Sequence, residues 1–112
     1  MKKVDIFTDG GCKGNPGPGG YGCILKQNDH IKELKGGVPQ TTNNIMEMTA
    51  VVVALKQLNE PCDIRLTTDS QYVVKGMTEW MKGWIRNGWQ TASRQPVKNK
   101  ELWQELDELS KP

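Results

Sequence analysis

The 112-residue sequence predicts an α/β protein with a mixed sheet, in which three antiparallel strands and a parallel fourth carry helices packed on them. Residues 4–9 alternate apolar and polar side chains, as a half-buried strand does. Residues 43–59 place apolar side chains at helical spacing, and residues 63–68 follow as another strand. Because strand–helix–strand units are right-handed with parallel strands, the fourth strand should lie beside the first and end next to Asp9.

The remaining elements fill this frame. Residues 10–20 are rich in glycine and proline, which predicts a flexible loop whose backbone can approach a ligand closely. Strands at residues 21–27 and 31–38, joined by a polar turn, would complete an antiparallel meander. Three more segments read as helices, the last of them capped by Asn99: residues 70–77, 79–87 and 99–109.

Composition and charge narrow the classes of protein. The balance of 15 basic and 13 acidic residues gives a net charge of +2, which alone does not indicate a nucleic-acid binder. Three cysteines without a CxxC pair disfavour a disulfide framework or a zinc site and favour reduced thiols. Neither a signal peptide nor a membrane-spanning apolar run is recognisable. We therefore expect a single domain over residues 1–112, cytoplasmic and without a membrane partner.

Three acids are expected at one end of the sheet: Asp9 ends the first strand, Glu47 lies near the start of the main helix, and Asp69 follows the fourth strand. Clustered carboxylates favour hard divalent cations, which bridge readily to phosphate. Each acid also has a structural alternative. Asp9 and the next glycine form a common turn pair, Asn44 and Glu47 have capping-box spacing, and Asp69 or the next serine could cap a helix. The expected convergence favours a site.

Four segments carry a family resemblance: IFTDGGCKGNPGPGGYG, TTNNIMEMTA, LTTDSQYV, and the Trp-rich GMTEWMKGWIRNGW followed by PVKNKELW. In order and spacing, over essentially the whole chain, the sequence resembles a bacterial type 1 ribonuclease H. The resemblance implies a ribonuclease H-like sheet and an endonuclease that hydrolyses the RNA strand of RNA/DNA hybrids with two Mg²⁺ ions, for which Mn²⁺ could substitute. It also implies that Asp9, Glu47 and Asp69 are the catalytic metal ligands. Two cations suit this chemistry, because one can activate water while the other relieves charge on the leaving oxygen.

The same resemblance implies contacts to the hybrid. A glycine-rich loop can bring backbone groups into a minor groove, where the 2′-hydroxyl distinguishes RNA from DNA. Alternatively, an asparagine at the start of the main helix is only its cap, and the loop cysteine is only a small buried residue. The candidates for hybrid contact are Cys12, Gly14, Asn15, Asn43, Asn44 and Gln71, and those for a DNA-phosphate pocket are Thr42 and Asn99.

Basic residues are concentrated between residues 75 and 100, where Glu79 is the single acid. This local excess predicts the phosphate-facing side, with Trp80, Trp84 and Lys98 as candidates for substrate contacts. A small aromatic core is the alternative for the two tryptophans, and we weigh it more heavily for Trp80 than for Trp84.

The family pattern continues with a fifth strand, a histidine-bearing loop and a last helix, which this chain lacks. His30 lies in a turn and does not match the loop histidine. We therefore expect a C-terminally incomplete fold whose fourth strand presents an open, fairly apolar edge. The resemblance implies a monomer, whereas self-association or a complementing C-terminal chain could supply the missing strand here. The alternative is that the chain is an incomplete fragment, which binds hybrid or a complementing chain without turnover.

Overall fold

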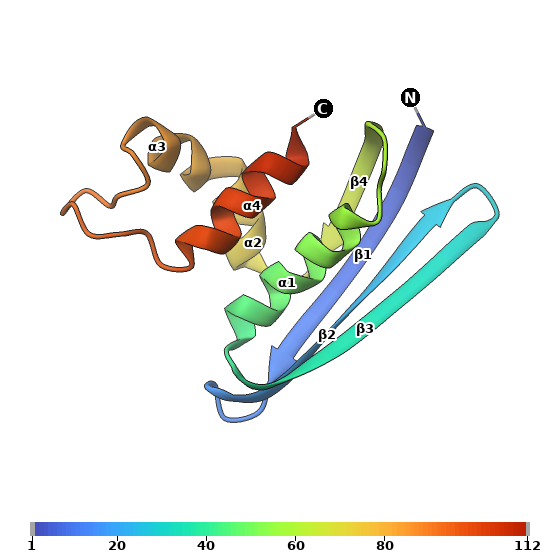
Figure 1. Cartoon of the computed structure of the whole chain (residues 1–112), viewed down its shortest axis with the longest axis horizontal. Coiled ribbons are helices and arrows are strands. Elements are labelled where there is room, and N and C mark those ends of the chain that lie inside the picture. The colour runs from blue at the N-terminus through green and yellow to red at the C-terminus, as the bar shows by residue number, and fades with distance from the viewer. Residues whose placement is uncertain (1, 112) are drawn as a thin grey trace.

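The computed structural model describes residues 2–111, which form one sheet with the strand order β3-β2-β1-β4 (Figure 1). Strands β1 (Lys2–Cys12), β2 (Gly17–Gln27) and β3 (His30–Thr41) form an antiparallel meander, and β4 (Cys62–Thr68) runs parallel to β1. The predicted mixed sheet is confirmed. In the described part of the chain, β4 pairs with β1 alone.

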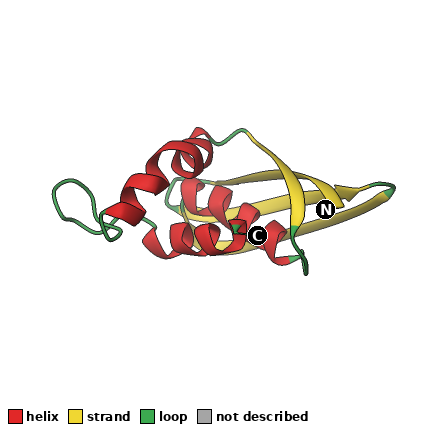
Figure 2. Cartoon of the chain, turned by 90° about the horizontal axis from the view of Figure 1, so that it is seen from above, coloured by secondary structure: helices red, strands yellow, loops and turns green. Residues whose placement is uncertain are grey.

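Helix α1 (Asn43–Lys56) crosses from β3 to β4 and packs on the sheet. After β4 the chain forms α2 (Gln71–Lys75), the π-helix η1 (Gly76–Trp80) and α3 (Met81–Arg86), which extend away from the strands (Figures 1 and 2). Helix α4 (Lys100–Ser110) returns to pack against α1. No helix among the described residues is both long and apolar enough to cross a membrane.

The core lies between the sheet and the helices. The alternation predicted for β1 is confirmed, because Val4, Ile6 and Thr8 are buried beneath α1. The other face of the sheet is open, and Phe7 is 40% exposed there. Helix α1 is buried nearly all round by the sheet and α4, which explains its long apolar sequence. Trp103 of α4 is completely buried in the same core.

The glycine-rich segment is mostly strand, not the predicted loop. Strand β1 continues past Asp9, and β2 begins at Gly17, so that residues 13–16 form the only turn between them. The glycines of this segment take part in the pairing of β1 with β2, where Gly11 lies opposite Gly20 and Cys12 opposite Gly19. Glycine has no side chain to show the period-two pattern, so the sequence signal of a strand is lost while its backbone pairing remains.

Two predicted helix boundaries are wrong. Helix α1 ends at Lys56, capped by Gln57, rather than at residue 59. The expected break near residue 78 is absent, because α2, η1 and α3 follow one another without interruption. Gly76, at the junction of α2 and η1, lets the Trp103 ring pack directly on the helix backbone, where a Cβ would collide with it.

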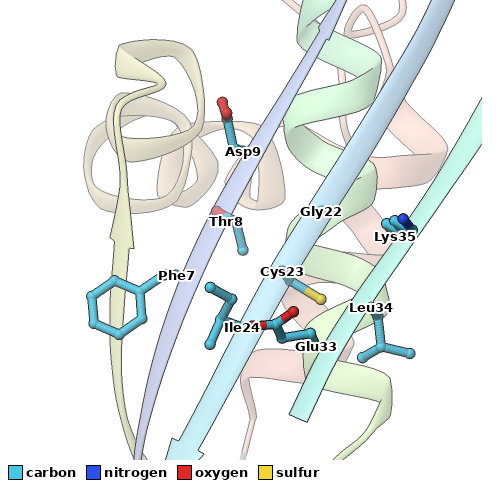
Figure 3. Close-up of a pocket in the computed structure, with 9 residues that line it drawn as sticks. All are labelled: Phe7, Thr8, Asp9, Gly22, Cys23, Ile24, Glu33, Leu34 and Lys35. Atoms are coloured by element: carbon cyan, nitrogen blue, oxygen red, sulfur yellow. The ribbon is translucent and has the colours of Figure 1, made fainter. Parts of the chain in front are cut away.

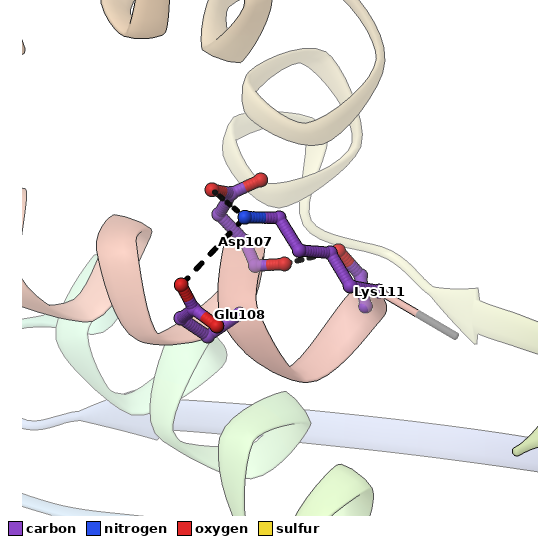
Figure 4. A network of polar contacts seen from close by, with 4 residues as sticks. Asp107, Glu108 and Lys111 are labelled. Atoms are coloured by element: carbon purple, nitrogen blue, oxygen red, sulfur yellow. Dashed lines mark hydrogen bonds and ion pairs between the residues drawn. The ribbon is translucent and has the colours of Figure 1, made fainter.

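The C-terminal turn of α4 carries exposed ion pairs (Figure 4). Lys111 Nζ lies 3.6 Å from a carboxylate oxygen of Asp107 and 3.6 Å from one of Glu108. Water screens such surface pairs, so they contribute little to the stability of the fold. The position of α4 is therefore set by its buried apolar side chains, Trp103 and Leu106.

Candidate active site

Two acids follow the last paired residues of the parallel strands. The pairing of β1 with β4 ends at Thr8 and Thr68, and Asp9 and Asp69 come directly after. Both aspartates are exposed. The predicted neighbourhood of these strands is confirmed, and their carboxyl ends place the two aspartates at the same edge of the sheet.

Glu47 reaches this edge from the first turns of α1. The strand and the helix approach so closely that a Cβ on Gly10 would lie 2.6 Å from the carbonyl carbon of Met46 and 2.8 Å from the backbone nitrogen of Glu47. Only glycine permits this approach. The need for glycine at position 10 was not predicted from the sequence. The position of Gly10 directly after Asp9 was the feature that could have indicated it.

The pKa of the Glu47 carboxyl is affected by the two aspartates nearby. Burial raises the pKa of the Glu47 carboxyl, the nearby backbone N–H of Gly10 lowers it, and the negative charges of Asp9 and Asp69 raise it. Its Oε1 atom is buried, and no hydrogen-bond partner for it exists among the described residues.

This donor set fits a divalent cation, because carboxylate oxygens are the ligands that Mg²⁺ and Ca²⁺ prefer and the buried Oε1 of Glu47 lacks a partner. The side chains are not gathered around one point, however. Within residues 2–111, no group of three acidic, histidine or cysteine side chains is close enough to hold a metal ion as it stands.

Helix α1 is capped by a residue other than the two asparagines. Thr42 is its N-cap, and the Thr42 hydroxyl accepts a hydrogen bond from the backbone N–H of Ile45 at 3.2 Å. The capping box suggested by the spacing of Asn44 and Glu47 is therefore wrong, because a box would join the N-cap and the third residue after it. Glu47 has no capping role that would explain it.

The structure also excludes the structural roles considered for the two aspartates, a helix cap for Asp69 and a turn for Asp9. Ser70, not Asp69, caps α2, since its hydroxyl accepts from the N–H of Val73 at 3.2 Å. Asp9 accepts a hydrogen bond from the N–H of Gly10 at 3.0 Å, but this pair lies within β1 rather than in a turn.

Three hybrid-contact candidates meet in one polar cluster, formed by Cys12, Asn15 and Asn43. The side-chain oxygen of Asn43 accepts from the backbone N–H of Cys12 at 2.8 Å, and the Asn43 N–H donates to the Asn15 side-chain oxygen at 2.9 Å. The Cys12 thiol lies 3.5 Å from the same Asn15 oxygen. Cys12 is only half-buried, and Gly14 turns the chain beside it with φ +80°. The β1–β2 turn is thereby fastened to the start of α1.

The remaining polar candidates lie at helix starts. Asn44 is half-buried in the first turn of α1, and Gln71 is the exposed first residue of α2. Asn99 occupies the N-cap position of α4 but does not cap it. With φ +59°, its amide instead donates to the Tyr72 hydroxyl at 3.2 Å, and the Trp103 indole donates to the same oxygen at 3.3 Å. Sequence reasoning missed Tyr72, which has no motif of its own.

The two tryptophan candidates differ in exposure, in the order opposite to the prediction. Trp80 is 38% exposed, whereas Trp84 is half-buried. The Trp84 ring centroid lies 5.4 Å from that of Trp103 in the core and 5.9 Å from that of Trp80. Trp84 is therefore part of an aromatic core, and Trp80 is the more available side chain. Lys98 is exposed just before α4.

A pocket that the sequence did not predict opens beside Asp9 on the uncovered face of the sheet (Figure 3). Its volume is about 460 Å³, and side chains of β1, β2 and β3 form its walls. Phe7 and Ile24 contribute apolar side chains to its lining, and Asp9, Glu33 and Lys35 contribute charged ones. The lining residues are Phe7, Thr8, Asp9, Gly22, Cys23, Ile24, Glu33, Leu34 and Lys35.

The sheet order, the parallel β1–β4 pair and the helices define a ribonuclease H-like α/β protein, and comparison with solved structures agrees. LC9-RNase H1, a type 1 RNase H with the type 2 active-site motif, superposes with a TM-score of 0.84 at 30% identity, over 97% of this chain and 58% of that one. LC11-RNase H1 in complex with an RNA/DNA hybrid shares the fold with a TM-score of 0.70 at 23% identity, over 95% of this chain and 75% of that one.

Sequence relatives identify the family. The family described as RNase H matches residues 1–112. The chain is 59% identical to the ribonuclease H of Brucella anthropi over 112 residues, which is all of this chain and 73% of that protein. It is 61% identical to that of Halorhodospira halophila over 107 residues, covering 96% of this chain and 72% of that protein. The chain belongs to the ribonuclease H family of endoribonucleases.

Proposed function

We propose that the chain is an endonuclease that hydrolyses the RNA strand of RNA/DNA hybrids, with Asp9, Glu47 and Asp69 as its catalytic residues. The observation that carries the proposal is that these acids lie near one another at one edge of the sheet. The charges of both aspartates, together with burial, raise the pKa of the Glu47 carboxyl. Family membership favours this activity, and the hybrid bound to LC11-RNase H1 favours this substrate.

Asp9, Glu47 and Asp69 would hold two Mg²⁺ ions, for which Mn²⁺ could substitute. The unpartnered Oε1 of Glu47 and the two exposed aspartates supply the oxygen ligands that such ions need. When bound, the cations supply an activated water and relieve charge on the leaving 3′ oxygen. Without them the three carboxylates repel one another, so the acids resemble a cation site more than a structural network.

The polar cluster of Cys12, Asn15 and Asn43 would lie in the minor groove of the hybrid. It combines main-chain and side-chain groups at the start of α1, on the element that also carries Glu47. A 2′-hydroxyl is both a donor and an acceptor, so a cluster with both kinds of group can recognise it. Gly14, Asn44 and Gln71 would extend this contact from the neighbouring turn and helix starts.

The DNA strand would lie against the helical side. Thr42 and Asn99 stand at the starts of α1 and α4, two helices that contact each other and begin toward the same end of the molecule (Figure 1). Backbone N–H groups at a helix start favour a phosphate, which suits the proposed phosphate pocket. Lys98 would add positive charge beside it, and Trp80 offers an exposed ring for a sugar or base. Trp84 would support that ring from below.

The test is cleavage of end-labelled RNA/DNA hybrid by the purified chain with Mg²⁺, with products resolved on a denaturing gel. Asp9→Asn should lower the rate at least about 100-fold. The matched control is Asp5→Asn, four residues earlier on the same exposed face of β1, which should cleave at the wild-type rate. Equal activity of both variants would remove Asp9 from the mechanism.

Binding without turnover is the second candidate, because the acids do not form a closed metal-binding group within the described residues. Fluorescence polarisation with labelled hybrid distinguishes the two functions. Retention of hybrid without products at any Mg²⁺ or Mn²⁺ concentration would favour binding alone. A cytoplasmic location belongs to either proposal and is favoured by the free thiols of Cys12, Cys23 and Cys62.

A further inference from the structure

Tyr72 is a half-buried side chain of α2 that contacts three residues outside that helix. Its hydroxyl oxygen accepts a hydrogen bond from the Asn99 side-chain amide at 3.2 Å and another from the Trp103 indole N–H at 3.3 Å. Its ring centroid lies 5.2 Å from that of Trp103 and 5.8 Å from that of Trp80, which it meets edge to face. Tyr72 therefore joins α2 to two proposed contacts of the DNA strand, the Asn99 amide and the exposed Trp80 ring.

The location of the Tyr72 hydroxyl is fixed by its surroundings. Helix α2 follows β4 closely, and at its start the Ser70 hydroxyl accepts from the N–H of Val73, a completely buried residue of the core. Trp103 is also completely buried, so its indole N–H needs a partner inside the protein, and the Tyr72 oxygen is that partner. The hydroxyl is thereby held at a set place relative to the end of β4, where Asp69 lies three residues before Tyr72.

The hydrogen bond to Tyr72 determines how Asn99 acts at the start of α4. An asparagine at an N-cap position ordinarily has extended backbone angles, and its side-chain oxygen accepts from an N–H of the first turn. Asn99 instead has φ +59° and makes no such bond, because its amide is directed to Tyr72. Helix α4 therefore begins without a side-chain cap, and uncapped N–H groups at a helix start favour a phosphate.

The Asn99 amide can serve Tyr72 and a phosphate together. An asparagine amide group has two hydrogens, and the bond to Tyr72 uses one of them. The other is left to donate to a phosphate oxygen beside the start of α4. Since the first bond fixes the plane of the amide, it also sets the direction of the second hydrogen.

We propose that Tyr72 is the positioning residue for the DNA strand of the hybrid, with its hydroxyl orienting the Asn99 amide toward a phosphate and its ring supporting Trp80. The role rests on the proposed function, in which Asn99 and Thr42 bind a DNA phosphate. Because Asp69 and Tyr72 lie at the start of one anchored helix, Tyr72 also keeps the phosphate contact at a constant distance from the acids.

Removing the hydroxyl alone tests this role. Tyr72→Phe keeps the ring against Trp80 but releases the Asn99 amide. It should raise the dissociation constant for hybrid roughly 3- to 10-fold, because hydrogen bonds to a charged phosphate are the stronger kind. Fluorescence polarisation with labelled hybrid measures this without divalent metal and at one salt concentration, so the result does not depend on turnover. With Mg²⁺ and saturating hybrid, kcat should change by less than about twofold, since Tyr72 touches no reacting group.

A double-mutant cycle shows whether Tyr72 acts through Asn99. Asn99→Ala should weaken binding at least as much as Tyr72→Phe. The variant that carries both changes should bind within about twofold of Asn99→Ala, because the hydroxyl then has no amide to orient.

Trp103→Phe is the control for lost stability. It removes the other donor to the same oxygen and leaves the bond to Asn99 in place. It should lower the midpoint of thermal unfolding at least as much as Tyr72→Phe, yet keep the affinity for hybrid within about twofold of the unmodified chain. Thermal unfolding of each variant sets a binding temperature at which all of them are folded.

Unchanged affinity in Tyr72→Phe, additive losses in the double variant, or an equal loss of affinity in Trp103→Phe would overturn the proposal. An unmodified chain that binds hybrid without cleaving it would refute only the proposed catalysis, because the cycle is measured by affinity. An unmodified chain that binds no hybrid would overturn the proposed function and the role of Tyr72 together.

Discussion

Replacing Glu47 with glutamine should stabilise the metal-free protein at neutral pH. The carboxylate is half-buried, its Oε1 has no hydrogen-bond partner among the described residues, and Asp9 and Asp69 repel its charge. A buried unsatisfied acceptor costs about 1–3 kcal/mol, and a charged one costs more. Glutamine keeps a polar atom at this position but removes the charge, and Glu47 is partly exposed, so the gain should be about 1 kcal/mol. For a domain of this size, that gain raises the midpoint of thermal unfolding by about 4 °C.

The gain should depend on pH in a defined direction. Because burial raises the pKa of Glu47 above its ordinary value of 4.5, the folded protein binds this proton more tightly than the unfolded chain. The stability that Glu47 contributes is therefore full below the unfolded pKa and is lost as pH rises through the raised folded pKa. Wild type and Glu47→Gln should be equally stable in acid, and the variant should become the more stable one toward pH 7.

Urea unfolding followed by circular dichroism at several pH values between about 3 and 8 measures this difference. Glu79→Gln, at an exposed glutamate of η1, is the matched control and should change stability by less than about 0.5 kcal/mol at every pH. Millimolar Mg²⁺ should stabilise wild type more than Glu47→Gln. A Gln variant that is less stable at pH 7, or an advantage that persists unchanged in acid, would refute this account of Glu47.

Three glycine substitutions follow from the packing. Gly10→Ala places a Cβ 2.6 Å from the Met46 carbonyl, so it should lower the free energy of unfolding by about 2 kcal/mol or more in urea titration and reduce cleavage. Gly76→Ala sets a methyl group against the Trp103 ring and should cost about 1–3 kcal/mol by the same measurement; wild-type stability would show that the ring can move away. Gly83→Ala, which meets nothing within 4 Å inside α3, should instead stabilise by up to about 1 kcal/mol, and a loss there would contradict the helix.

Much of the fold could be predicted because side-chain periodicity survives in the sequence. The alternation of Val4, Ile6 and Thr8 and the apolar spacing in α1 located the sheet and its covering helix. The handedness of strand–helix–strand units then made β4 parallel to β1. The strand through residues 10–12 and 17–20 was missed, because glycine has no side chain with which to signal a face.

The candidate acids could be predicted because each is adjacent in sequence to the end of a predictable element. The sequence does not predict which hydroxyl or amide caps a helix, because capping depends on the backbone angles of one residue. Thr42 has extended angles and caps α1, whereas Asn99 has φ +59° and directs its amide to Tyr72. The sequence also could not predict that Trp80 is more exposed than Trp84, because their exposure depends on where α4 places Trp103.

The aromatic contacts have a spectroscopic consequence. All four tryptophans of the chain, at positions 80, 84, 89 and 103, belong to one set of rings whose successive centroids lie 5.4–6.4 Å apart. None lies in the sheet. Tryptophan emission therefore reports the helical side of the molecule, where excitation can pass between neighbouring rings, and it is silent about the β1–β2 turn. A fluorophore on the Cys12 thiol, at the end of β1, would report the other side.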